Sequence, residues 1–352
     1  MAQTVRKAFV STLVVVGVIA LALALWKLKL VIFLVFFGFV VAAAMRPGID
    51  WLAERRIPRP AGVAIHYVAL AVALGLLLWL AVPRAVDQVS QALGSVPTSK
   101  EELRQQTKHS TGVKHSILLG AQKRLKKLPS AGAVAHGAVE VGLKAFEVLI
   151  GIFFVLATAA YWIFERDRAM RLVTSMAPRK HRRVIRETWE LIDLKLGAFV
   201  RGQLVLIAFV ATVLSVCFWA IGLPFWLLVG VTAGFFEIVP VIGPLAAGGL
   251  AIAVGLTVSW QLALAAGIVV LVVRLLEDYV VIPRVMGHVT GVSPLLVLVG
   301  VTAIGLLFGG VYILLATPLL AVLVTLVDVI VRDKDPADED VPAVLFAKES
   351  RG

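Results

Sequence analysis

Long apolar stretches recur along the chain from residue 9 to residue 331, separated by shorter polar and charged segments. A helix that crosses a bilayer needs about 20 predominantly apolar residues. Six stretches approach or exceed this length: 9–25, 30–45, 61–82, 148–164, 198–222 and 258–283. Runs of this kind exceed the strands and core helices of ordinary soluble domains. The pattern therefore predicts an all-α polytopic membrane protein with about six full transmembrane helices.

Two further apolar runs, 223–256 and 295–327, do not fit a single span. Each contains 33 or 34 residues, which is about 50 Å of helix against a hydrocarbon core of roughly 30 Å. Two full spans and a turn need about 40 residues or more. Each run therefore fits a re-entrant hairpin, in which two half-length helical arms enter and leave by one face.

Both runs are broken near the middle by residues that interrupt helices. The first break holds Pro240, Gly243 and Pro244, and the second is Gly309 followed by Gly310. Proline removes a backbone donor, and glycine permits a sharp turn. Irregular backbone at membrane depth is tolerated only where protein or a water-filled cavity satisfies the freed groups. The two breaks therefore predict a pathway for a solute or an ion.

The positive charges predict how the chain is oriented. Lys and Arg number 34 against 22 Asp and Glu, a net charge of +12. Because short loops rich in Lys and Arg face the cytoplasm, residues 46–60 and 165–197 are predicted to be cytoplasmic. Both termini are then cytoplasmic, and residues 84–140 lie outside. With the same parity, the first hairpin enters from outside and the second from inside, so the two hairpins are opposed.

These assignments divide the chain into five segments. Residues 1–83 hold the first three transmembrane helices, and residues 84–140 form a small extracytoplasmic helical subdomain of short amphipathic pieces. Residues 141–197 hold the fourth transmembrane helix and a basic cytoplasmic segment. Residues 198–331 form the transport core with its two hairpins. The acidic tail, 332–352, is expected to be solvated and mobile.

Composition and motifs argue against several other classes of protein. The positive net charge could indicate a nucleic-acid binder, but no folded soluble surface with base-reading groups is available. The single cysteine, Cys217, allows no disulfide framework and no zinc constellation. HExxH, GxSxG and phosphate-binding glycine-loop motifs do not occur in the sequence. We therefore expect no enzyme activity, no cofactor and no bound metal, with energy taken from an ion gradient or from the substrate's own gradient.

Glu237 is the most informative ionisable residue. It ends the first arm just before the proline-rich break, close to the predicted bilayer midplane. Pro244 suits the first position of the next arm, whose partially positive N-terminus would point at the same place. A carboxylate at this depth is costly and tends to be a proton or cation site. The alternative is that Glu237 only accepts hydrogen bonds from turn amides.

The stretch 258–283 carries three more charges, Arg274, Glu277 and Asp278. Arg274 and Asp278 lie one helical turn apart, so an internal ion pair is the structural alternative to a role in transport. Glu277 is then the freer candidate for an ion pathway. Arg201 and Gln203, near the cytoplasmic start of the fifth span, are explained by snorkelling to the interface.

Several of these residues also carry a family resemblance. Residues 196–203 read LGAFVRGQ, residues 222–224 read GLP, and residues 237–244 read EIVPVIGP. With Glu277, Pro283, Pro294 and the glycine pair at 309–310, this pattern resembles the autoinducer-2 exporter family of bacterial transporters. The pattern is spread over nearly the whole chain.

The resemblance implies a multi-pass bacterial plasma-membrane protein that exports small molecules, among them the signal autoinducer-2. Some relatives in this family are reported as sodium/proton antiporters, and members are homo-oligomers, for which a pentamer is expected here. The family's two turns fall on residues 240–244 and 309–310. Where many relatives have small or amide residues, this chain has Asp278, Tyr279 and Ile282, which leaves the substrate open.

Three functional hypotheses follow. The first is a secondary transporter that exports a small polar solute like autoinducer-2, driven by an ion gradient. The second is a Na⁺(Li⁺)/H⁺ antiporter, with monovalent cations and protons as its partners. The third is a membrane scaffold that transports nothing and holds protein partners. The midplane acid and the opposed, broken hairpins favour transport, because a scaffold has no use for a buried charge in the bilayer.

Overall fold

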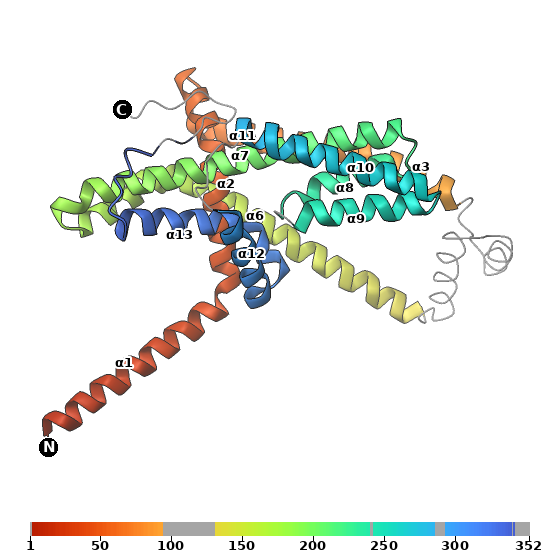
Figure 1. Ribbon diagram of the computed structural model, residues 1–352. Helices are drawn as coiled ribbons and strands as arrows, with labels where there is room; N and C mark the ends of the chain where they lie inside the picture. The colour runs from red at the N-terminus through yellow and green to blue at the C-terminus, as the bar shows by residue number, and fades with distance from the viewer. Residues whose placement is uncertain (1, 94–130, 240–241, 286–292, 340, 342–352) are drawn as a thin grey trace.

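The computed structural model describes residues 2–93, 131–239, 242–285, 293–339 and 341 (Figure 1). Every regular element within these ranges is helical, which confirms the prediction of an all-α polytopic membrane protein.

Five helical segments are long and apolar enough to cross a membrane, judged by length and composition. They are α2 (Lys29–Glu54), the first part of α3 (Arg59–Leu93), most of α6 (Ala131–Met176), η1 with α7 (Arg179–His181 and Arg182–Ala220), and η3 with α13 (Gly310–Leu315 and Ala316–Ile330).

The remaining apolar helices are shorter or only partly described. They are α1 (Ala2–Lys27), α8 (Trp226–Phe236), α9 (Ile242–Leu256), α10 (Trp260–Leu276) and α12 (Pro294–Phe308). The predicted span 258–283 corresponds to α10, a π-helical turn η2 (Glu277–Val281) and the short α11 (Ile282–Val285), which continue one another.

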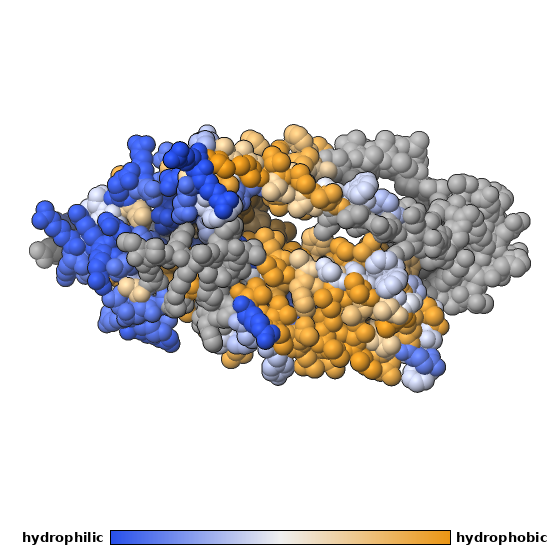
Figure 2. Space-filling model, turned by 90° about the horizontal axis from the view of Figure 1, so that it is seen from above, coloured by the Kyte–Doolittle hydropathy of each residue, from blue (hydrophilic) through white to orange (hydrophobic). Residues whose placement is uncertain are grey.

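The predicted basic cytoplasmic segment is almost entirely helical. α6 has 46 residues and α7 has 39, so they are about 69 and 58 Å long, well beyond a hydrocarbon core of roughly 30 Å. Both therefore project past the apolar layer around their shared turn at residues 177–181. Figure 2 shows hydrophilic residues gathered at one end of the molecule and hydrophobic residues over its middle.

The largest buried cluster surrounds α8 and α9. These two helices lie side by side against α7 and α10 (Figure 1). The cluster draws on all four helices, with Leu214 and Phe218 from α7, Val229 from α8, Ala251 from α9 and Ala266 from α10. Small residues on α9 and α10 allow close approach of helices in an apolar environment. The first long apolar run therefore packs against the helices before and after it.

The two apolar runs differ in the length of their arms. In the first run, α8 has 11 residues and α9 has 15, the lengths expected of half-length arms. In the second, α12 has 15 residues, but Gly310–Ile330 has 21 and is long enough to cross. The half-length prediction is wrong for this last arm, because η3 winds the residues after the break into helix and α13 continues past residue 327. Entry and exit by one face stay a prediction.

Two predictions at the soluble ends had different outcomes. The external subdomain at 84–140 lies mostly outside the described residues, with α3 ending at Leu93 and α6 beginning at Ala131. Most residues of the described part of the tail are exposed, as expected, and the mobility of the tail stays a prediction. Two of its side chains, those of Asp335 and Glu339, nevertheless form ion pairs with side chains of α7.

Candidate transport site

The structure brings four predicted residues into one cluster. The guanidinium of Arg274 lies 3.0 Å from Glu277 Oε2, 3.0 Å from Asp278 Oδ1 and 3.6 Å from Glu237 Oε2. The predicted Arg274–Asp278 pair is present, but the same arginine also contacts the two glutamates. Glu277 is therefore less free than the sequence indicated.

Burial differs across the cluster. Glu237 and Glu277 are 6% and 2% exposed, whereas the Asp278 side chain is 41% exposed. Glu277 Oε1 is buried and accepts no hydrogen bond from the described residues. Three carboxyl groups thus surround one guanidinium, which leaves an excess of two negative charges when all three are ionised. Such an excess in a buried place calls for protons or cations.

A π-helical turn shapes the arginine side of the cluster. Glu277 and Asp278 open η2, directly after α10 ends at Leu276. π-Turns are rare, mostly single turns inside α-helices, and are frequent at functional sites. The apolar pattern predicted a regular helix over this stretch and did not reveal the turn. Pro283, five residues after Asp278, is a signal that the helix is perturbed there, although it does not specify a π-turn.

The other side of the cluster is the end of α8. Glu237 is the C-terminal cap of this helix, and its carbonyl oxygen accepts a hydrogen bond of 2.7 Å from Gln203 Nε2 of α7. The snorkelling interpretation is therefore wrong for Gln203. It is also wrong for Arg201, which is 8% exposed and donates to the carbonyls of Ala43 and Ala44 on α2. α7 thus holds both the break and α2 through polar side chains.

Close backbone contact explains Gly243 in the first break. A Cβ atom at this position would lie 2.5 Å from the carbonyl carbon of Phe236 and 3.2 Å from the backbone nitrogen of Glu237. The start of α9 therefore touches the end of α8 at the residue that bears the carboxylate. Pro244 is the third residue of α9, whereas the prediction placed it at the first position. Pro240 lies outside the described residues.

The second break belongs to different surroundings. Gly309 has a φ of 109°, a conformation that L side chains rarely adopt, and ends α12. Next to it, Tyr312 packs on Phe33 of α2 with ring centroids 4.9 Å apart. Lys29 Nζ lies 4.6 Å from the ring centre of Trp26 and 5.8 Å from that of Tyr312. Gly309 and Gly310 therefore lie next to a cluster of aromatic side chains where α1 meets α2. This cluster is separate from the charged cluster around Arg274.

Comparison with known proteins identifies the family. The model described as "AI-2E family transporter" matches residues 13–332. The chain belongs to the AI-2E transporter family.

Curated relatives carry names that agree with this assignment. The chain is 23% identical over 288 residues to "Putative transport protein YrrI" of Bacillus subtilis (strain 168), covering 80% of this chain and 82% of that protein. It is 27% identical to "Putative transport protein YueF" of the same organism, covering 77% and 76%. It is 24% identical over 331 residues to "Putative transport protein MT0215" of Mycobacterium tuberculosis (strain CDC 1551 / Oshkosh), covering 92% and 90%.

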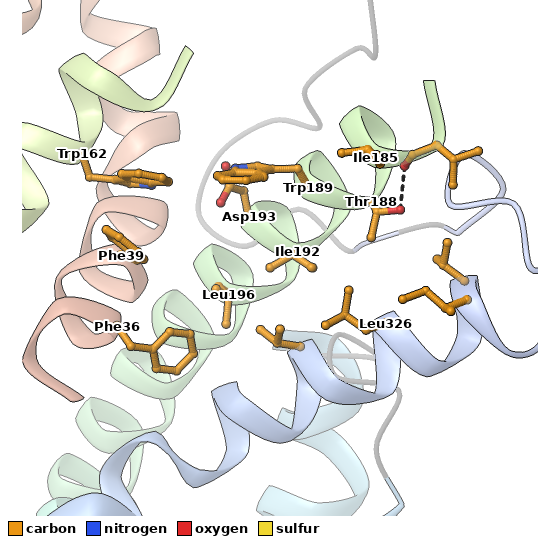
Figure 3. Close-up of a pocket in the computed structure, with 14 residues that line it drawn as sticks. Phe36, Phe39, Trp162, Ile185, Thr188, Trp189, Ile192, Asp193, Leu196 and Leu326 are labelled. Atoms are coloured by element: carbon orange, nitrogen blue, oxygen red, sulfur yellow. Dashed lines mark hydrogen bonds between the residues drawn. The ribbon is translucent and has the colours of Figure 1, made fainter. Parts of the chain in front are cut away.

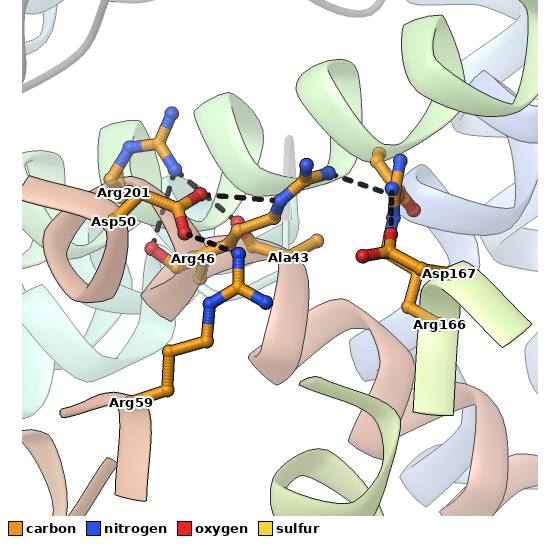
Figure 4. Close-up of polar contacts among 9 residues, drawn as sticks. Ala43, Arg46, Asp50, Arg59, Arg166, Asp167 and Arg201 are labelled. Atoms are coloured by element: carbon orange, nitrogen blue, oxygen red, sulfur yellow. Dashed lines mark hydrogen bonds and ion pairs between the residues drawn. The ribbon is translucent and has the colours of Figure 1, made fainter. Parts of the chain in front are cut away.

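A second polar region in this AI-2E family chain ties α2, α3, α6 and α7 together (Figure 4). Arg46 lies 3.4 Å from Asp50 and 3.7 Å from Asp193. Arg166 pairs with Asp193, and Arg59 lies 3.8 Å from Asp50. In the sequence, these arginines indicated only that residues 46–60 and 165–197 are cytoplasmic. Their charges are matched by carboxylates, so this region is a structural network and not a candidate transport site.

An apolar cavity of about 360 Å³ lies near this network, between α2, α6, α7 and α13 (Figure 3). Aromatic rings form one wall, with Phe39 and Trp162 stacked at 4.1 Å and Trp162 and Trp189 at 5.8 Å between ring centroids. Its one lining carboxylate, Asp193, is held by arginines. The lining suits an apolar group better than a polar solute, so the cluster around Arg274 remains the better candidate transport site of this AI-2E family chain.

Proposed function

We propose that this AI-2E family chain is a secondary transporter of the bacterial cytoplasmic membrane that exports a small polar solute like autoinducer-2, driven by an ion gradient. The observation that carries the proposal is the cluster of Glu237, Glu277 and Asp278 around Arg274. Its two buried carboxyl groups come from different segments and meet where the apolar helices are broken. A buried carboxylate in a membrane must take up a proton or hold a cation, which is what a coupled carrier requires.

A solute would bind where the two segments meet. Arg274 offers hydrogen-bond donors, the carboxyl groups offer acceptors, and backbone freed at the break offers both. A hydroxylated, polar molecule could replace part of the contact between Arg274 and Glu237, which at 3.6 Å is the loosest of the three. Protonation of a glutamate would weaken that contact further. Protonation of Glu237 would thereby free the guanidinium for the solute, which couples solute binding to proton uptake.

A second candidate is Na⁺(Li⁺)/H⁺ antiport, and a specific observation favours it. The cluster has more carboxyl groups than cations, and Glu277 Oε1 is buried without a donor among the described residues. Carboxylate oxygens are the ligands that hard cations prefer. In this version a monovalent cation and protons would alternate on Glu237 and Glu277, and no organic solute would be needed.

Flux in proteoliposomes distinguishes these candidates. Wild-type protein is tested with autoinducer-2 and, separately, with Na⁺ or Li⁺, with and without a pH gradient. Solute flux supports export, and cation flux that requires the pH gradient supports antiport. Absence of flux with every probe would favour the scaffold hypothesis.

The matched variants are Glu237→Gln and Glu165→Gln. Glutamine keeps the size and most hydrogen bonds of Glu237 while removing its titration, so dependence on the pH gradient should be lost. Glu165 has a side chain that is 57% exposed and lies outside the cluster, so its variant should behave like wild type. If Glu237→Gln retained full pH-driven flux, the proposed coupling role would be assigned to Glu277 and not to Glu237.

The orientation of the hairpins is part of the proposal, with both termini cytoplasmic. In a Cys217→Ser background, single cysteines replacing Arg284 and Arg182 should react with impermeant thiol reagents only from the cytoplasm. Cysteines placed within residues 100–127 should react only from outside. Outside labelling at position 284 would mean that residues 223–256 cross the membrane once, and the opposed-hairpin arrangement would be abandoned.

We further propose, from the family resemblance, that the chain assembles as a homo-oligomer, with a pentamer as the expected form. Large apolar side chains on α1, α3 and α6 are exposed in the single chain, among them Phe9, Trp79 and Phe153. Such surfaces contact lipid or neighbouring copies. Native mass spectrometry from detergent micelles would give the number of copies directly.

A further inference from the structure

Lys195 of α7 is a buried cation far along the sequence from the cluster around Arg274. Its side chain is only 3% exposed, and its Nζ donates a hydrogen bond of 3.0 Å to Thr325 Oγ1 of α13. Thr325 is fully buried and uses its own hydroxyl hydrogen on the carbonyl of Ala321. A buried ammonium is costly unless a carboxylate accompanies it. The helices α7 and α13 supply the hydroxyl but not that carboxylate.

The carboxylate comes from the C-terminal tail. Glu339 Oε1 lies 2.7 Å from Lys195 Nζ. Glu339 is 36% exposed, so the anion sits at the surface while the cation that it neutralises is enclosed.

Three further contacts direct the tail to this place. Asp328, near the end of α13, contacts both Arg332 and Lys334 at 2.8 Å, which fixes the turn out of the helix. Asp335 then lies 2.7 Å from Arg183 of α7. These contacts are independent of Lys195, so the path of the tail does not depend on one ion pair.

Beyond Glu339, the tail reaches a second helix. Val341 packs with Phe199 of α7 and Val285 of α11 in one apolar cluster. α11 continues the π-turn that begins with Glu277 and Asp278. The tail therefore crosses α7 and packs in the same apolar cluster as the helical segment that carries the candidate transport site.

We propose that Lys195 and Thr325 form a carboxylate-binding site whose ligand is the acidic tail of the same chain, and that the docked tail is a latch holding α11 against α7. The pairing explains a buried cation that nothing in the transport site uses. Glu339 belongs to the tail and lies at the surface. The tail can therefore leave Lys195 and move into solvent, which opens the latch. Movement of η2 and α11 relative to α7 would require that opening. The proposal does not depend on what the protein transports.

Docking is tested by cysteine protection in the full chain. In a Cys217→Ser background with a single cysteine replacing Val341, the initial rate of maleimide labelling reports exposure of the tail. Glu339→Gln should raise this rate roughly tenfold or more, because hydrogen bonds to charged groups are among the stronger ones. Asp338→Asn removes the same charge one residue earlier, from a side chain that forms no ion pair with the described residues. It should leave the labelling rate within about twofold, which corresponds to a small fraction of the energy of such a bond.

The latch is tested on the same variants without the cysteine, by hydrogen–deuterium exchange of peptides covering residues 277–285. Glu339→Gln should exchange faster in this region than wild type or Asp338→Asn, because release of the tail frees α11. Lys195→Met provides a second route to the same release. Unchanged labelling in Glu339→Gln would overturn the binding site. Raised labelling with unchanged exchange over 277–285 would overturn the latch.

Discussion

The contact between Gly243 and the end of α8 gives the most direct test of the site's architecture. In Gly243→Ala the new methyl carbon would lie 2.5 Å from the carbonyl carbon of Phe236, and the carbonyl oxygen is closer still. These are backbone atoms, so they cannot give way by rotating a side chain. α9 must move away from α8, and the cap residue Glu237 moves with it. Overpacking of this kind costs typically about 1–3 kcal/mol.

A matched control lies in the same helix. A Cβ at Gly249 of α9 would have no neighbouring atom within 4 Å. Gly249→Ala should therefore gain helix propensity, up to about 1 kcal/mol. Thermal unfolding in detergent should order the proteins as Gly249→Ala, wild type and Gly243→Ala, from most to least stable. In proteoliposomes, Gly243→Ala should also lose flux, because the displaced carboxylate of Glu237 no longer contacts Arg274. If Gly243→Ala unfolded at or above the wild-type temperature with full flux, the close corner between α8 and α9 would be refuted.

Two further pairs of variants test other parts of the structure. Gly309→Ala should lower the unfolding free energy by about 1–3 kcal/mol because a φ of 109° is strained for alanine, whereas Gly310→Ala, with open space around its Cβ, should be tolerated; equal stability of the two would contradict this backbone geometry. Arg166→Gln should lower the unfolding free energy by about 1.5–3 kcal/mol, because Asp193 loses a charged hydrogen bond and keeps only Arg46, 3.7 Å away. Arg168→Gln, which loses a side chain 72% exposed, should change it by at most about 1 kcal/mol; chemical denaturation of the two variants in detergent measures the difference.

The sequence was informative wherever one residue type has one physical explanation. Apolar length predicted the helices, since nothing but a membrane-embedded helix uses such runs. Prolines and glycines predicted the break after α8, and the cost of a buried acid singled out Glu237. Arg274 and Asp278 were paired correctly from their spacing alone. These inferences depend on local chemistry and need no knowledge of which helices are neighbours.

The sequence was uninformative where the outcome depends on tertiary neighbours. Arg201 and Gln203 lie near a predicted span end, where snorkelling is the usual explanation, and only the positions of α2 and α8 show what they bind. Lys195 lies in a segment predicted to be cytoplasmic, and its burial follows from packing against α13. The π-turn at Glu277 differs from an α-helix by a single residue, which no periodicity over so short a stretch can resolve.

That π-turn has a consequence for the surface that α11 presents. Each residue of an α-helix advances the direction of its side chain by about 100°, and a π-turn accommodates one residue more than an α-turn does. Side chains after η2 are therefore rotated by about a quarter turn or more relative to an unbroken continuation of α10. In this rotated register, Val285 packs against the apolar cluster that contains Phe199 and Val341. A regular α-helix of unchanged length would turn Val285 away from the tail, whereas deleting one residue from η2 would remove the π-turn and leave Val285 facing it.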